Sequence, residues 1–268
     1  ADGVIHLPLG QGDVEAGGVA SVALLRPPEA VAQTITHIGS HDLTLDILAD
    51  QLRRAYPDRS LNSLHVGSMA GLQALARGEA HFAGSHLLDP DSGEYNLPLL
   101  KRMFGQLPLV VLSFVRRAQG LIVSRGNPKK LHALHDLSRP DVRFVNRQRG
   151  SGTRLLLDYH LGRLQINPVR IRGYDHSEPS HLTVAAAVKN GAADAGLGIL
   201  SAARALDLDF IPLFQESYQL IIPEAHYEGV LLAPLLTIIR SDDFRQTVAA
   251  LGGYDVSGMG EIVFRLSG

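Results

Sequence analysis

The chain has 268 residues, of which 45% are hydrophobic and 19% charged, and its formal net charge is −2. These proportions are typical of a globular chain with a full core, and the charge argues against the basic surface of a polyanion-binding domain. The chain contains no cysteine, which excludes a disulfide framework and any thiolate metal site.

The first part of the chain differs from the rest. Residues 4–9 and 19–25 predict two short strands, and the double proline at Pro27 and Pro28 ends the pattern. Two strands alone are only marginally stable. We therefore expect residues 1–35 to be a hairpin with a linker, set apart from the main body as the end of a β-domain whose earlier part is missing. No apolar run reaches the roughly 18–20 residues that span a bilayer.

From residue 34 onward, predicted strands alternate with predicted helices. Ser40 is a favourable N-cap, and Leu45, Leu48 and Leu52 then recur at helical spacing. The first series has strands at 34–38, 61–66, 80–84 and 107–114, with helices at 41–55 and 68–75. The second series has strands at 121–124, 143–146, 169–173, 193–197, 210–213 and 218–222, with helices at 152–164, 179–190, 199–205, 229–239 and 242–251.

This alternation predicts an α/β fold of mainly parallel sheets with helices on both faces. The two series join near residues 117–120 and again near 217–220, which predicts two lobes, each with its own sheet, and two hinge crossings. The expected first lobe comprises residues 36–118 and 221–268, and the second comprises residues 119–220.

Glycine and hydroxyl residues gather at four of the predicted strand–helix junctions. A helix N-terminus presents unpaired N–H groups and partial positive charge, and glycine lets an anion approach the backbone. Such junctions meet at the carboxyl ends of the strands. A plain N-cap is the alternative for each one. The candidate ligand contacts are Ser40, Ser68, Ser85, Ser151, Gly152 and Thr153.

Two arginines flank the junction at residues 150–153. Arg147 and Arg154 lie in a stretch without acidic residues between Asp141 and Asp158. A guanidinium suits an oxyanion because it donates paired, charge-assisted hydrogen bonds, so we add both to the candidate ligand contacts. The alternative is a solvated face that pairs with the flanking aspartates.

The chain has 12 histidines, but their spacing does not predict a metal site. His37 and His41 are four residues apart, with Gly39 and Ser40 between them, so they are not expected on one helix face. Supporting roles beside an anion are expected for His41 and His86. No phosphate-binding loop, nucleophile elbow or nucleophile–base pair is evident, so no catalytic residue is predicted.

As a set, several motifs resemble those of the periplasmic-binding-protein-like domain that is associated with molybdenum-related proteins. They are residues 39–42, 67–72, 78–81, 86–89, 93–96, 119–121, 126–128, 146–148, 150–154 and 193–198. The resemblance implies a type II periplasmic-binding-protein fold whose lobes close over a ligand. It also implies molybdate or tungstate as that ligand, with Ser40, Ser68, Ser151, Thr153 and Arg154 as the best contacts.

Residues 1–27 resemble the last hairpin of the C-terminal β-domain of molybdopterin molybdenumtransferase, the molybdenum insertase. The resemblance implies that this chain is not an enzyme by itself and that an insertase domain precedes it in the same parent protein. We accordingly expect a cytoplasmic location, a role in molybdenum cofactor biosynthesis, and no cofactor, no direct nucleic-acid partner and no membrane partner.

Three other functions remain open from the sequence. The chain could bind a pterin or another small organic anion, for which Tyr95, Tyr174 and Tyr218 could supply an aromatic wall. It could be the ligand-sensing domain of a transcription regulator. A hydrolase or transferase would need a nucleophile and a base that the sequence does not reveal.

Overall fold

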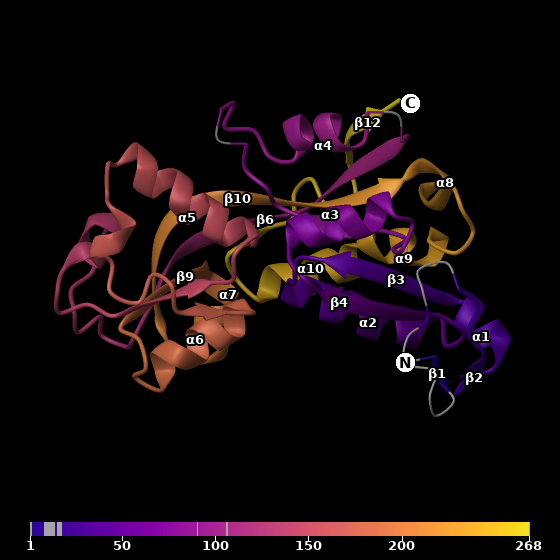
Figure 1. Cartoon of the computed structure of the whole chain (residues 1–268), viewed down its shortest axis with the longest axis horizontal. Helices are drawn as coiled ribbons and strands as arrows, with labels where there is room; N and C mark the ends of the chain where they lie inside the picture. The colour runs from indigo at the N-terminus through magenta and orange to yellow at the C-terminus, as the bar shows by residue number, and fades with distance from the viewer. Residues whose placement is uncertain (1, 8–13, 15–17, 90, 106, 268) are drawn as a thin grey trace.

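The structure is a computed structural model that describes residues 2–7, 14, 18–89, 91–105 and 107–267. Within these ranges, none of the helices combines the length and the apolar character needed to cross a membrane. Two lobes lie side by side, and two long strands run through both of them (Figure 1).

The first lobe packs helices on both sides of its strands. One core lies beneath α2, α9 and α10 and includes Leu48 and Phe244, and a second lies beneath α3 and α4 and includes Leu72 and Leu100. The elements of this lobe are β3 (Thr34–Gly39), α2 (Leu43–Ala55), β4 (Ser60–His65), α3 (Ser68–Ala76), β5 (Ala83–Ser85), α4 (Leu97–Met103), α8 (Glu224–Tyr227), α9 (Ala233–Ile239), α10 (Asp242–Ala250), β11 (Tyr254–Asp255) and β12 (Ile262–Leu266).

The second lobe has the same layered arrangement. Leu157 and Leu161 of α5 enter one core, while Val184 of α6 and Ala203 of α7 enter the other. Its elements are the 3₁₀ helices η1 (Leu134–Ser138) and η2 (Pro168–Arg170), the strands β7 (Phe144–Arg147), β8 (Ser177–Glu178) and β9 (Ala195–Ile199), and the helices α5 (Gly152–Arg163), α6 (His181–Lys189) and α7 (Leu200–Ala205).

The strands β6 (Leu109–Val123) and β10 (Asp209–Pro223) form the two hinge crossings. They pair antiparallel along their whole length, with register shifts near Pro212 and Tyr218. β5 pairs with β10 at the first-lobe end, and β9 pairs with β6 at the second-lobe end. Hydrogen bonding therefore continues in the order β5-β10-β6-β9-β7-β8.

This continuity corrects the expectation of a separate, mainly parallel sheet in each lobe. The parallel pairs are β3 with β4, β7 with β8 and β7 with β9, whereas both hinge strands pair antiparallel. For each crossing the sequence predicts two short strands, but the structure has one continuous 15-residue strand in their place. The polar residues Arg117 and Glu216 interrupt the apolar runs, but they are opposite each other in the ladder, so the backbone pairing continues.

Three local predictions are also corrected. The N-cap of α2 is Asp42 rather than Ser40, because its carboxylate accepts a hydrogen bond from Thr44 N at 2.9 Å. Residues 168–170 form a 3₁₀ turn instead of a strand, since Pro168 removes a backbone donor at its start. The sequence also did not predict α4, β8, β11 and β12.

The N-terminal segment forms a two-stranded sheet of its own. β1 (Gly3–Ile5) pairs antiparallel with β2 (Val22–Leu24), and α1 (Pro28–Ala32) then leads into β3. Arg26 ties this segment to the first lobe through hydrogen bonds to Thr34 and Ser60. Of the predicted strand at 4–9, residues 4 and 5 belong to β1, and residues 8 and 9 lie outside the described residues, as does the turn at 10–12.

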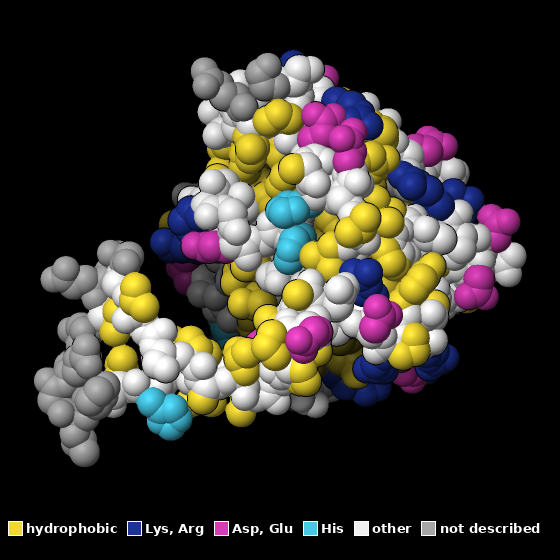
Figure 2. Space-filling model, turned by 90° about the vertical axis from the view of Figure 1, so that its right-hand side faces the viewer, with side chains coloured by type: hydrophobic (Ala, Val, Ile, Leu, Met, Phe, Trp, Pro, Cys, Tyr) yellow, Lys and Arg dark blue, Asp and Glu magenta, His cyan; other side chains and the backbone are white. Residues whose placement is uncertain are grey.

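At the first-lobe end of the molecule, basic and acidic side chains alternate with neutral and hydrophobic ones (Figure 2). No broad patch of one charge covers the described side chains of this face. This distribution agrees with the near-neutral composition.

Candidate functional site

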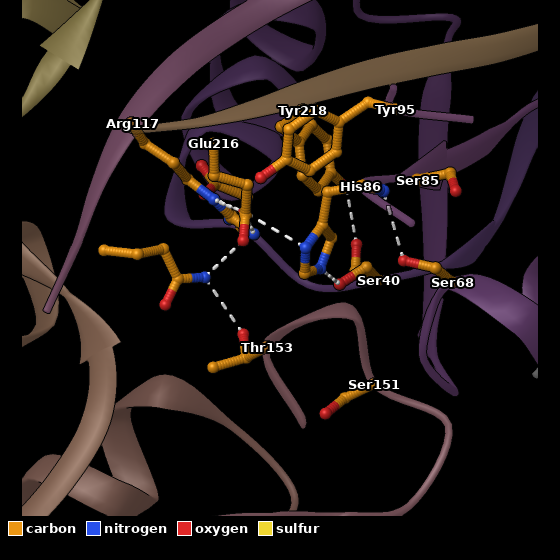
Figure 3. Close-up of polar contacts among 12 residues, drawn as sticks. Ser40, Ser68, Ser85, His86, Tyr95, Arg117, Ser151, Thr153, Glu216 and Tyr218 are labelled. Atoms are coloured by element: carbon orange, nitrogen blue, oxygen red, sulfur yellow. Dashed lines mark hydrogen bonds and ion pairs between the residues drawn. The ribbon is translucent and has the colours of Figure 1, made fainter. Parts of the chain in front are cut away.

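Predicted ligand residues from both lobes face each other where the lobes meet (Figure 3). Ser40 follows β3 directly, and Ser68 opens α3 just beyond the carboxyl end of β4. From the second lobe, Ser151 caps α5 and Thr153 lies in its first turn. All four side chains are buried. Within each lobe, chain order places these hydroxyls at the carboxyl ends of strands, because each follows such a strand or opens the helix after it.

Glycines allow the two lobes to touch at this point. A Cβ atom added to Gly152 would lie 2.3 Å from Nδ1 of His86, across the boundary between the lobes. Gly67, with a φ of +88°, faces the carbonyl oxygen of Gly150, 3.6 Å from the position of its missing Cβ. The structure therefore has the lobes in contact, and Gly152 has no room for a side chain in this state.

The hydroxyls of Ser68, Ser151 and Thr153 share one property. Each oxygen accepts a hydrogen bond, respectively from His86 N at 3.3 Å, Arg154 N at 3.2 Å and Gln119 Nε2 at 3.0 Å. A hydroxyl also carries one hydrogen of its own to donate. Among the described residues, none accepts from these three hydroxyls within hydrogen-bond distance. Three buried O–H donors, one from the first lobe and two from the second, thus remain available to a ligand.

A buried ionic cluster lies behind these hydroxyls. The guanidinium of Arg117 pairs with Asp42 and with Glu216, whose Oε1 accepts from Arg117 Nε at 2.6 Å. Gln119 Nε2 donates both to Glu216 Oε2 at 2.5 Å and to Thr153. Burial alone would raise the pKa of Glu216, but the charge of Arg117 opposes it and the net pKa falls to about 2. Glu216 is therefore ionised at neutral pH.

The ionised Glu216 fixes the tautomer of His86. Its Oε1 lies 3.0 Å from His86 Nδ1, and His86 Nε2 lies 2.8 Å from Ser40 Oγ. Burial lowers the pKa of His86 despite the nearby carboxylate, so the ring is neutral at neutral pH. Since Nδ1 faces a carboxylate it carries the proton, and Nε2 accepts the hydroxyl hydrogen of Ser40. Ser40 is thereby a weaker donor to a ligand than the other three hydroxyls.

Arg147 supplies positive charge from the second lobe. The side chain is buried, and it donates to the carbonyl oxygens of Glu178 at 3.2 Å and Pro179 at 3.0 Å. Burial, with the charge of Arg117 adding to it, lowers the pKa of Arg147 to about 10. The guanidinium is still charged at neutral pH.

His181 is a buried side chain without a partner. It is the first residue of α6, and neither ring nitrogen has a hydrogen-bond partner among the described residues. Burial lowers its pKa well below the usual range, and the charges of Arg147, Arg117 and His86 lower it further. Because those charges belong to the cluster at the boundary between the lobes, His181 is near it. An unpaired polar group in such a place costs free energy unless a ligand satisfies it.

Two predicted contacts are not brought to this cluster. The hydroxyl of Ser85 donates to Asn96 Oδ1 at 2.7 Å, within a network that holds the loop after β5. The guanidinium of Arg154 lies against Asp158, 3.2 Å from Oδ1, and over the ring of Tyr174. An aspartate one helical turn away captures Arg154, which is the alternative that the sequence left open.

Several residues of the cluster were not predicted. Arg117, Gln119 and Glu216 have a visible signal, since they are polar residues within otherwise apolar strand runs. His181 has none, because a histidine in the first turn of a helix is unremarkable without knowledge of its burial.

The fold and the site together define a two-lobed binding protein with ligand-contacting groups between hinged lobes. The chain belongs to the PBP superfamily, whose domain matches residues 49–240. Its architecture is that of the two-lobed type II periplasmic binding proteins.

Relatives and solved structures agree with this assignment. The chain is 35% identical to the uncharacterised protein YvgK of Bacillus subtilis (strain 168), over 84% of this chain and 72% of that protein. A protein of Clostridium perfringens described as a phosphate ABC transporter substrate-binding protein, with phosphate bound, has a TM-score of 0.60 at 14% identity, covering 81% of this chain and 97% of the other. A domain assigned to a molybdenum ABC transporter of Clostridium difficile has a TM-score of 0.53 at 14% identity, covering 83% and 97%.

Proposed function

We propose that this chain binds a small tetrahedral oxyanion between its lobes, with molybdate or tungstate as the favoured ligands. The observation that carries the proposal is the set of buried hydroxyls of Ser68, Ser151 and Thr153, each of which accepts a hydrogen bond and keeps its own O–H. A dianion stripped of water needs a nearly complete shell of donors. The first turns of α3 and α5 add backbone N–H groups to that shell.

The site has no large excess of positive charge, and this supports selective binding of an anion. Arg117 and Arg147 balance the carboxylates of Asp42 and Glu216, so the cluster is close to neutral. Directed hydrogen bonds must then supply most of the affinity. His181, with two unpaired ring nitrogens, is a further contact for the ligand.

The descriptions of two proteins of similar fold and the sequence of the N-terminal segment support the choice of ligand. One protein of similar fold was solved with phosphate, and another is assigned to a molybdenum transporter. Residues 1–27 resemble the end of a molybdenum insertase, which favours a role for the bound anion in molybdenum cofactor biosynthesis.

A pterin-sized ligand fits the site less well. Of the three tyrosines that could form an aromatic wall, Tyr95 and Tyr218 lie near the ionic cluster and Tyr174 lies apart from them, and each is already engaged by the protein. Tyr218 is buried and donates to the backbone oxygen of Ser40, Tyr174 packs against Arg154, and Tyr95 donates to the backbone oxygen of Gln215.

One observation favours a second function, that of a hydrolase. Ser40 Oγ hydrogen-bonds to His86 Nε2, and His86 Nδ1 lies 3.0 Å from Glu216 Oε1, which is the order of a nucleophile, a base and an orienting carboxylate. We favour binding because His86 Nδ1 makes no hydrogen bond to Glu216, and because Glu216 Oε1 already accepts from Arg117 Nε and pairs with its guanidinium, which offsets the charge that would stabilise a protonated His86. Mass spectrometry after treatment with a fluorophosphonate separates the two functions: binding alone predicts no adduct, and an adduct on Ser40 would establish the hydrolase.

The binding proposal is tested by calorimetry with molybdate on four variants. Thr153→Val removes the hydroxyl but keeps the shape, and Ser151→Ala removes the second donor. Each should weaken binding by roughly 1–3 kcal/mol, the scale of a hydrogen bond to a charged group. Thr153→Ser should retain binding. Ser177→Ala, an exposed serine in the same lobe, is the control. Unchanged affinity in Thr153→Val and Ser151→Ala would place the ligand elsewhere.

A further inference from the structure

A second group of side chains lies beside the proposed oxyanion site and shares no side chain with it. His41 follows Ser40 in the loop after β3, Asp46 lies in the first turn of α2, and His65 ends β4. His41 Nε2 is 3.1 Å from Asp46 Oδ2, and the rings of His41 and His65 are 4.2 Å apart between centroids. One possible ligand atom from each of the three residues lies within 4.8 Å of the other two.

The strand pairing creates this group. In the parallel pair of β3 and β4, Gly39 is opposite His65, so the carboxyl ends of both strands coincide. From the sequence, we considered His37 with His41 and expected no metal site. The structure instead brings His41 next to His65, which is 24 residues away, and α2 adds the carboxylate of Asp46.

The chemistry of the group is that of a transition-metal site. Two imidazoles and one carboxylate are a ligand set of zinc sites that keep a coordination position open. Ser63 Oγ lies 3.0 Å from His65 Nε2 and 2.7 Å from His37 Nδ1, so it orients the His65 ring from outside. Such outer contacts commonly position metal-binding histidines. The side chain of Asp46 is 57% exposed, so an ion has a direct path to the group.

We propose that His41, Asp46 and His65 form a binding site for a divalent transition-metal ion such as Zn²⁺, beside the boundary between the lobes. The site holds the ion through two imidazole nitrogens and one carboxylate oxygen, and water completes the coordination. Since His41 adjoins Ser40, the ion lies close to the oxyanion site. The two sites use different side chains, so metal binding can be measured without any oxyanion.

Calorimetric titration of the full chain with zinc chloride alone tests the proposal. The wild-type protein should bind one ion per chain. His41→Ala and His65→Ala should each lower the affinity by at least about tenfold, in line with the sensitivity of metal sites to their ligands. Asp46→Asn, at an exposed position that tolerates substitution, should weaken binding as well.

The chain offers a matched control. The imidazole rings of His81 and His226 are also close together, with centroids 4.9 Å apart. Among the described residues, however, no third metal-ligating side chain completes a group with them. His226→Ala should therefore bind zinc as tightly as the wild type. Replacement of zinc by Co²⁺ should give the visible absorption of a four-coordinate ion, lost in Asp46→Asn. No binding by the wild type, or equal binding by His41→Ala, His65→Ala and Asp46→Asn, would overturn the proposal.

Discussion

At the scale of single residues, the site depends on which hydroxyl hydrogens are already donated to other protein groups and which are free for a ligand. The ionised Glu216 makes Nδ1 of His86 a donor, and Nε2 then takes the hydroxyl hydrogen of Ser40. The hydroxyls of Ser68 and Thr153 have the opposite role, because each accepts from a neighbour and keeps its hydrogen. A hydroxyl side chain thus stabilises the protein at one position, Ser40, and is free to bind a ligand at the others.

The low pKa of Glu216 predicts a specific dependence of stability on pH. Its pKa falls from a usual value of 4.5 to about 2 in the folded chain. A lowered carboxylate pKa contributes stability that is complete above pH 4.5 and is lost as the pH falls toward 2. The contribution is on the order of 3 kcal/mol, from 1.36 kcal/mol for each pKa unit.

Chemical unfolding of the wild type and Glu216→Gln at several pH values measures this contribution. The variant should be less stable at neutral pH, because Arg117 loses one of its two carboxylate partners. It should also lose less stability on acidification than the wild type. Parallel curves for the two proteins between pH 4.5 and 2 would show that Glu216 is not paired as described.

At the scale of elements, the sequence predicts site residues whose role depends only on neighbours in the same turn or helix. It does not predict residues whose role depends on burial in the folded chain. Ser151 caps a helix as expected, because an N-cap needs only its own turn. The sequence predicts breaks between strands near residues 117–120 and 217–220, but Arg117 and Glu216 pair across two strands and are 99 residues apart, which no local signal reveals. Arg154 was predicted to face the ligand, but Asp158 in the same helix captures it. His181 is recognisable only once the lobes are assembled.

The N-terminus of α5 controls how closely the lobes approach. Gly152→Ala should hold the lobes apart, because its Cβ would meet the His86 ring at 2.3 Å. In the presence of molybdate, small-angle X-ray scattering should show a larger radius of gyration for Gly152→Ala than for the wild type. The affinity of this variant for molybdate should also be lower. Gly162→Ala, in the same helix with no atom within 4 Å of the added Cβ, is the control. A compact, tightly binding Gly152→Ala would contradict this role.

At the scale of the whole molecule, the two lobes and the two crossing strands couple binding to closure. Ser68 belongs to the first lobe, whereas Ser151 and Thr153 belong to the second, so the complete set of donors exists only when the lobes are in contact. A ligand that needs all three then favours the closed state over any open one. Gln119 on β6 joins Thr153 to Glu216 and so connects the hinge to the site.

The most direct test is a crystal structure of the protein grown with tungstate, in which the anomalous signal of tungsten locates the ion. The account predicts one peak between the lobes, with tungstate oxygens within hydrogen-bond distance of Ser68 Oγ, Ser151 Oγ and Thr153 Oγ1, and with α3 and α5 pointing their N-termini at it. A tungsten peak outside the boundary between the lobes, or an empty cleft in a tungstate-saturated crystal, would contradict it.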